Sequence, residues 1–163
     1  MQLFGPTGQN DSERRLLLRS QGPRIDVTLR NSMGNPSVNE LSAKYFQSSQ
    51  NASALIDTGA SVNCIDNQIA KQLNLKVIDF RLMRSASDSG LTPVYLGKVE
   101  IPKLNETIFG EFYGAELAQS GQNHRLLLGT PFLSSFIFNY DGPKGVFYIG
   151  RSTELLKDLP FDE

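Results

Sequence analysis

The sequence contains no tryptophan and, among its 163 residues, only one cysteine, Cys64, and one histidine, His124. A single cysteine excludes an internal disulfide, and this scarcity fits a reducing compartment. One cysteine and one histidine cannot form the clusters that bind zinc. They would form a nucleophilic pair only if the fold brought them together. We instead expect Cys64 to be a small, buried apolar residue.

The chain also lacks a charge excess of either sign and a long hydrophobic run. Lys and Arg number 16 against 17 Asp and Glu, so the net charge is -1 and no global field attracts nucleic acid or membrane. Residues 1–6 show no basic stretch followed by an apolar one, so we expect no signal peptide and no bilayer-spanning segment. We therefore expect a cytoplasmic protein without nucleic-acid or membrane partners. Early arginines alternate with acidic residues and predict a solvated segment: Arg14, Arg15, Arg19, Arg24 and Arg30.

The size and apolar content of the chain suit one domain. At this length a domain buries roughly two-thirds of its unfolded surface, and the apolar content of 39%, with ten Phe residues, is adequate for a core. Residues 1–22 are polar and rich in Gly, Arg and Ser, so we expect a flexible N-terminal arm there. We place the domain at residues 23–150 and a C-terminal tail at residues 151–163.

Period-two alternation and short apolar runs predict many short strands, of which residues 24–30 are the clearest. Residues 31–51 are rich in Asn, Ser and Gly and are interpreted as a long hairpin connection. Asp66 is predicted to cap one short helix, and Thr130 to cap another with Pro131 in its first position. These elements predict an all-β barrel with one or two short helices. The other strands are predicted at 52–56, 77–82, 94–101, 107–113, 126–129, 136–140 and 146–149.

The most informative stretch is residues 54–61, which read Ala-Leu-Ile-Asp-Thr-Gly-Ala-Ser. An apolar strand leads one carboxylate, Asp57, into a turn, which places the acid at a strand end beside a cavity. Gly59 lets backbone N–H groups approach this carboxylate. Thr58 offers a hydroxyl that can tie the turn to its counterpart across a twofold axis. Ser61 is placed to hydrogen-bond the outer carboxylate oxygen.

A single carboxylate is ionised near neutral pH and is a poor general acid. Two carboxyl groups about 3 Å apart cannot both ionise, so they share one proton. The ionised member then takes a proton from a water molecule, while the protonated member polarises the peptide carbonyl. Hydrolysis by this route needs no metal, no cofactor and no covalent intermediate. Because the motif occurs once, the simplest source of a second Asp57 is a homodimer.

A second candidate acid, Asp88, precedes Ser89 and Gly90 in a turn similar to that of Asp57. If Asp88 were the partner, the enzyme could act as a monomer. However, no apolar strand leads into this turn, and a spacing of 31 residues from Asp57 is too short for a second half-barrel. We therefore interpret the segment from Ser87 to Gly90 as the tip of a flap.

An apolar pair followed by glycine stands 70 residues after Asp57, just before the second predicted helix: Leu127, Leu128 and Gly129. Together with the Asp57 turn, this segment resembles the retropepsins, the single-domain, homodimeric aspartic proteases of retroviruses, retroelements and some bacteria. The resemblance extends over roughly residues 24–150. It implies a retropepsin-like closed barrel, which is half of a pepsin-type fold, with peptide or protein substrates and no cofactor.

The resemblance also implies roles for particular residues. Asp57 would be the catalytic acid, and the hairpin from Ser85 to Tyr95 would be the flap that closes over substrate. Leu127 to Gly129 would be the second scaffold motif. The active-site turn would consist of Thr58, Gly59, Ala60 and Ser61.

Residues 129–133, Gly-Thr-Pro-Phe-Leu, are more similar to the cellular, bacterial-type members than to the retroviral ones. The retroviral pattern has Gly-Arg where Thr130 and Pro131 stand here, and a Gly-Gly flap tip where this chain has Gly90 alone. A retroviral or retroelement enzyme is the alternative within the family. The alternative function is a catalytically silent domain of the same fold that binds peptides or proteins, in which Asp57 only caps a turn.

Overall fold

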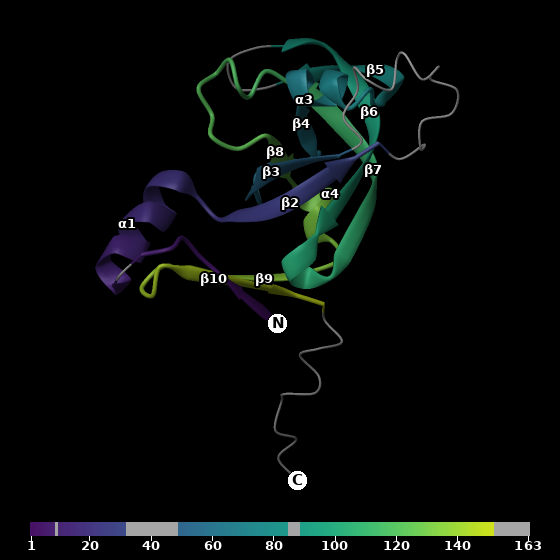
Figure 1. The fold of residues 1–163 in the computed structure, drawn as a ribbon. Coiled ribbons are helices and arrows are strands. Elements are labelled where there is room, and N and C mark those ends of the chain that lie inside the picture. Colours follow the sequence, from purple (N-terminus) through teal and green to yellow (C-terminus); the bar gives the residue numbers. More distant parts are fainter. Residues whose placement is uncertain (9, 32–48, 85–88, 152–163) are drawn as a thin grey trace.

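The structure is a computed structural model that describes residues 1–8, 10–31, 49–84 and 89–151 (Figure 1). Three predicted features lie outside these ranges. They are most of the connection at 31–51, the flap tip with Ser87 and Asp88, and all but the first residue of the tail at 151–163. No helix in the described ranges is both long enough and apolar enough to cross a membrane.

Six strands close into a barrel, because β2 pairs with β3 at one side and with β6 at the other. The order around the barrel is β2-β3-β8-β4-β7-β6, and β5 pairs with β6 outside the ring. This mostly-β closed barrel confirms the predicted fold class. The strands are β2 (Arg24–Arg30), β3 (Ser49–Ile56), β4 (Cys64–Asp66), β5 (Lys76–Arg84), β6 (Ser89–Ile101), β7 (Glu106–Ala115) and β8 (Leu126–Leu128).

The alternation of β2 explains how the barrel is filled. Ile25, Val27 and Leu29 are buried, whereas Asp26 between them is exposed. The same period-two pattern in the neighbouring strands points apolar side chains inward, where Phe112 of β7 is fully buried. The barrel interior is therefore the main core of the molecule, and its outer surface is free to carry a site.

A second, three-stranded sheet lies at the opposite end of the molecule from β5 and α3 (Figure 1). Its order is β1-β10-β9, and both pairings are antiparallel. Lys144 and Gly145 lie in the turn between β9 and β10, where the sequence predicts one. The strands are β1 (Gln2–Phe4), β9 (Ile137–Asp141) and β10 (Val146–Gly150).

The N-terminal segment differs from the flexible arm expected at residues 1–22, since it contains β1 and a helix, α1 (Asp11–Gln21). The physical reason is apolar anchoring. Phe4 stacks on Phe147 with ring centroids 5.4 Å apart, and Leu18 is buried against the core. The energy of burying these side chains offsets the entropy of ordering a polar segment.

Among the described residues, three short helical segments connect the strands: α3 (Asn67–Gln72), the 3₁₀ helix η1 (Pro102–Leu104) and α4 (Thr130–Leu133). Asp66 caps α3 as predicted, since its carboxylate accepts the N–H groups of Gln68 and Ile69. The predicted cap of α4 is wrong: Gly129 is the N-cap and Thr130 lies inside the helix. The reason is that the Gly129 carbonyl accepts the N–H of Leu133 at 3.0 Å, so the helical hydrogen bonds begin one residue earlier than predicted.

Candidate active site

Asp57 follows directly after β3, where this strand runs parallel to β8 in the centre of the barrel sheet. Its backbone N–H donates to the Leu128 carbonyl at 3.0 Å. Three residues later, the Ala60 carbonyl accepts the N–H of Thr130 at 2.9 Å. The turn that carries Asp57 is therefore fixed at both ends to the segment that follows β8.

The carboxylate of Asp57 is held by its own turn. Its Oδ1 accepts the backbone N–H of Gly59 at 2.9 Å, and the Asp57 carbonyl accepts the N–H of Ala60 at 3.2 Å. A Cβ on Gly59 would lie 3.3 Å from Oδ1, closer than most side-chain contacts allow. The predicted role of Gly59 in bringing a backbone donor to the carboxylate agrees with this geometry.

Asn63 is a site residue that the sequence analysis missed. Its side-chain Oδ1 accepts the N–H of Gly129 at 2.9 Å, its carbonyl accepts the N–H of Tyr113 at 2.8 Å, and the residue is buried. The side chain thus links the Asp57 turn to the segment after β8. The sequence did contain a signal for it. Asn63 is a polar residue between Val62 and Cys64, shortly after the turn, and the buried strand β4 begins directly after it.

Gly129 is where these two segments approach most closely. A Cβ added there would lie 2.5 Å from the carbonyl oxygens of both Ala60 and Val62. Only glycine fits, which explains why an apolar pair followed by Gly occurs at this point. Leu128, the second member of the pair, is buried in the core, and Leu127 points to the other face of β8.

A cavity of about 540 Å³ lies beside the Asp57 turn and extends toward β5. Gly59, Ala60 and Ser61 of the turn form one wall. The other walls are mostly apolar and come from four different strands and the segment before β4: Val62, Cys64, Leu82, Met83, Tyr113 and Leu127. This arrangement suits an extended chain with apolar side chains lying beside the Asp57 turn.

The remaining predicted site residues are placed as follows. Thr58 and Ser61 are exposed, and no hydrogen bond joins the Ser61 hydroxyl to the Asp57 carboxylate in the described part of the chain. Ser89 and Gly90 begin β6, which pairs with β5 as the two arms of the predicted flap. Leu82 and Leu91 face each other across these arms, and both are exposed.

Cys64 and His124 are both buried, as expected for the cysteine. Burial, with a smaller contribution from the charge of Asp57, raises the pKa of the Cys64 thiol to about 11. Burial and the nearby Arg24 and Arg125 lower the pKa of His124, against a weaker opposing effect of Asp57. A neutral thiol and a neutral imidazole do not make an activated nucleophile. The described residues also include no group of three or more His, Cys, Asp or Glu side chains that could hold a metal ion.

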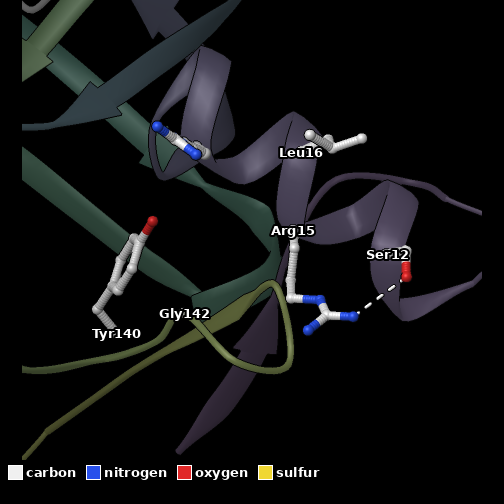
Figure 2. A pocket seen from close by; sticks show the side chains of 6 residues that line it. Ser12, Arg15, Leu16, Tyr140 and Gly142 are labelled. Carbon is white, nitrogen blue, oxygen red and sulfur yellow. Dashed lines mark hydrogen bonds between the residues drawn. The ribbon is translucent and has the colours of Figure 1, made fainter.

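A separate hollow of about 480 Å³ lies between α1 and the turn that joins β9 to β10 (Figure 2). The Arg15 side chain turns toward Ser12 and donates a hydrogen bond to its hydroxyl at 3.1 Å, and Tyr140 lies on the opposite side of the hollow. Leu16 and Arg19 complete the described lining. None of these side chains is a carboxylic acid, so the hollow offers no partner for Asp57.

The family model described as Aspartyl protease matches residues 41–132, which is 92 of the 163 residues. This chain belongs to the aspartyl protease family. The matched region of this aspartyl protease contains the Asp57 turn, the arms of the predicted flap and the segment from Leu127 to Gly129.

Two solved structures show limited similarity to this aspartyl protease. The solution structure of the simian foamy virus (mac) protease aligns with a TM-score of 0.43 and 12% identity, over 68% of this chain and 91% of the viral one. The foamy viral protease–reverse transcriptase in complex with an RNA/DNA hybrid aligns with a TM-score of 0.43 and 13% identity, over 68% of this chain and 11% of that one. No curated protein matches the sequence.

Proposed function

We propose that this aspartyl protease is an endopeptidase whose catalytic pair consists of two Asp57 carboxyl groups, one from each subunit of a homodimer. The observation that carries the proposal is the Asp57 carboxylate in a glycine-containing turn beside a cavity of about 540 Å³. Membership of the aspartyl protease family supports peptidase chemistry. The substrate is a peptide or protein, and no cofactor takes part.

The cavity lining supports the proposal of a second subunit. None of the described residues that line the cavity carries a carboxyl group. A lone Asp57 would have no second acid beside it to polarise the peptide carbonyl. A twofold axis beside the Asp57 turn supplies the identical group and makes the site symmetric. The exposed Thr58 hydroxyl is available to tie the two turns together across this axis.

The pair then works by sharing one proton. Repulsion between adjacent carboxylates keeps one of them protonated, so the two titrate as a unit. The ionised Asp57 removes a proton from the attacking water, and the protonated one donates a hydrogen bond to the carbonyl oxygen. The Gly59 N–H, which already binds Oδ1, holds the carboxylate orientation during this transfer. Activity is therefore expected to fall as the pH rises through the upper pKa of the pair.

The direct test replaces Asp57 with Asn, which preserves shape and removes the shareable acid. We expect the substitution to reduce kcat/KM by about 10³-fold or more, since the general base is lost. Asp26→Asn is the matched control, because Asp26 is exposed on β2 and does not line the cavity. Peptide cleavage at acidic pH is followed by mass spectrometry for wild type and both variants.

The outcomes separate the two functions that the sequence leaves open. Loss of cleavage in Asp57→Asn alone supports the protease. The silent binding domain is supported instead if wild type and both variants bind a peptide equally well and none of the three proteins cleaves it. Within the family, we propose a bacterial-type enzyme because Thr130 and Pro131 follow Gly129.

A further inference from the structure

A second hollow, of about 470 Å³, adjoins the cavity beside the Asp57 turn, and Met83 of β5 lines both. This second hollow lies between the flap arm β6 and the segment that follows β7. Leu91 and Pro93 form an apolar wall on the β6 side. Because only the width of Met83 lies between the two spaces, the second hollow is within reach of a side chain of a peptide that binds in the cavity.

Glu116 is the only charged residue among the described residues that line either space. It is exposed, and its Oε1 accepts the Nδ2 of Asn67 at 2.6 Å. The side-chain oxygen of Asn67 in turn accepts the hydroxyl of Tyr95 at 3.0 Å. This chain of hydrogen bonds fixes the orientation of the amide, so the amide presents a donor and not an acceptor to Glu116.

Within the described part of the chain, no hydrogen bond reaches the second oxygen of Glu116, Oε2. The negative field of this carboxylate extends into the protein, since it adds to burial in raising the pKa of the Tyr95 hydroxyl. The hollow therefore combines apolar walls with a held carboxylate that has free acceptor capacity. A lysine or arginine side chain matches both features, because its stem packs on apolar surface while its charged head pairs with a carboxylate.

We propose that Glu116 is a specificity-determining residue that selects substrates with a lysine or arginine at one fixed position near the scissile bond. The inference rests on the proposed peptidase function of Asp57. The aliphatic stem would pack against Met83, Leu91 and Pro93, and the cation would pair with Oε2 of Glu116. A single carboxylate in an open hollow does not suffice for a divalent cation, which prefers several oxygen ligands.

The test is a cleavage profile on a peptide library that samples every residue type on both sides of the scissile bond. Wild type is expected to enrich Lys and Arg at one position by about three- to tenfold in kcat/KM, as for a partly exposed charged pair. Glu116→Gln should abolish this enrichment while cleavage of peptides without a basic residue continues. Glu116→Lys should enrich Asp and Glu at the same position. Asp26→Asn is the matched control and should keep the wild-type profile.

The outcomes distinguish failure of this inference from failure of the proposed function. A wild type that cleaves peptides without enriching Lys or Arg overturns the inference and leaves the protease intact. An enrichment that survives in Glu116→Gln also overturns it. If wild type cleaves no peptide, the proposed function fails and the inference fails with it. Thermal melts of both Glu116 variants check that the fold is kept.

Discussion

At Gly129, the absence of a side chain lets the Asp57 turn pack against the segment after β8. An added Cβ would lie 2.5 Å from two carbonyl oxygens, those of Ala60 and Val62, and main-chain atoms cannot rotate away. We expect Gly129→Ala to lower the free energy of unfolding by about 2–4 kcal/mol, as overpacking at a rigid site does. Urea denaturation measures this change, and kcat should fall in parallel because the Asp57 turn is displaced.

Gly110 provides the matched control in the same domain. It lies in β7, and an added Cβ would have no heavy atom within 4 Å. Gly110→Ala should therefore change the free energy of unfolding by no more than about 0.5 kcal/mol. Equal destabilisation by the two substitutions would contradict the account of Gly129.

His124 predicts a pH dependence of stability. The residue is 4% exposed, its Nδ1 has no hydrogen-bond partner in the described part of the chain, and burial with Arg24 and Arg125 lowers its pKa. The unfolded state then binds a proton at higher pH than the folded state does. Stability is lost as the pH falls through the unfolded pKa of about 6.5, and the loss ends below the lowered folded pKa.

The comparison variant for this prediction is His124→Gln, which removes the titrating group. Between about pH 8 and pH 5, wild type should lose more free energy of unfolding than the variant does. Urea denaturation at several pH values gives both curves. Parallel curves for the two proteins would show that His124 is not the group responsible.

At the scale of secondary structure, α1 is the element that the sequence analysis misjudged. The run from Leu16 to Leu18 gives no clear helical periodicity, and the surrounding polar residues suggest an arm. A capping signal was nevertheless present, since Asn10 accepts the N–H of Glu13 at 2.9 Å with its side chain. The sequence does not reveal that the N-terminal segment contacts a strand far away in the chain. This contact is the stacking of Phe4 on Phe147 of β10.

The role of α1 in the fold is tested by two leucines on the same helix. Leu18 is 1% exposed and packs in the core, whereas Leu16 is 67% exposed. Leu18→Ala should lower the free energy of unfolding by about 2–5 kcal/mol, because it leaves a cavity. Leu16→Ala should change it by no more than about 0.5 kcal/mol. If residues 1–22 were a free arm, the two substitutions would have the same small effect.

The barrel strands were predictable because one face of each is buried, which leaves a period-two pattern such as that of β2. The Asp57 turn was also predictable as a turn at a strand end, because an apolar run leads into Asp57 and glycine follows two residues later. The contacts of Asn63 and Glu116 were not predictable from the sequence. Their roles depend on partners far away in the sequence, Gly129 for one and Asn67 for the other, which only the closed barrel brings together.

At the scale of the whole molecule, apolar side chains fill the interior of the barrel, and the Asp57 turn lies outside this core. Asp57 stands at the end of a central strand, and the described cavity beside it supplies apolar walls without a second acid. The proposed homodimer therefore completes a single site that the two subunits share. Activity should depend on the concentration of dimer.

The measurement that tests this account most directly is subunit mixing. Wild type at a fixed concentration is allowed to exchange with an equal amount of Asp57→Asn, and peptide cleavage is then measured. A mixed dimer has one Asp57 and should be inactive, so random exchange should leave about half of the wild-type activity. A larger excess of the variant should reduce it further. Wild-type activity that is unaffected by any excess of exchanged Asp57→Asn would contradict the shared Asp57 pair.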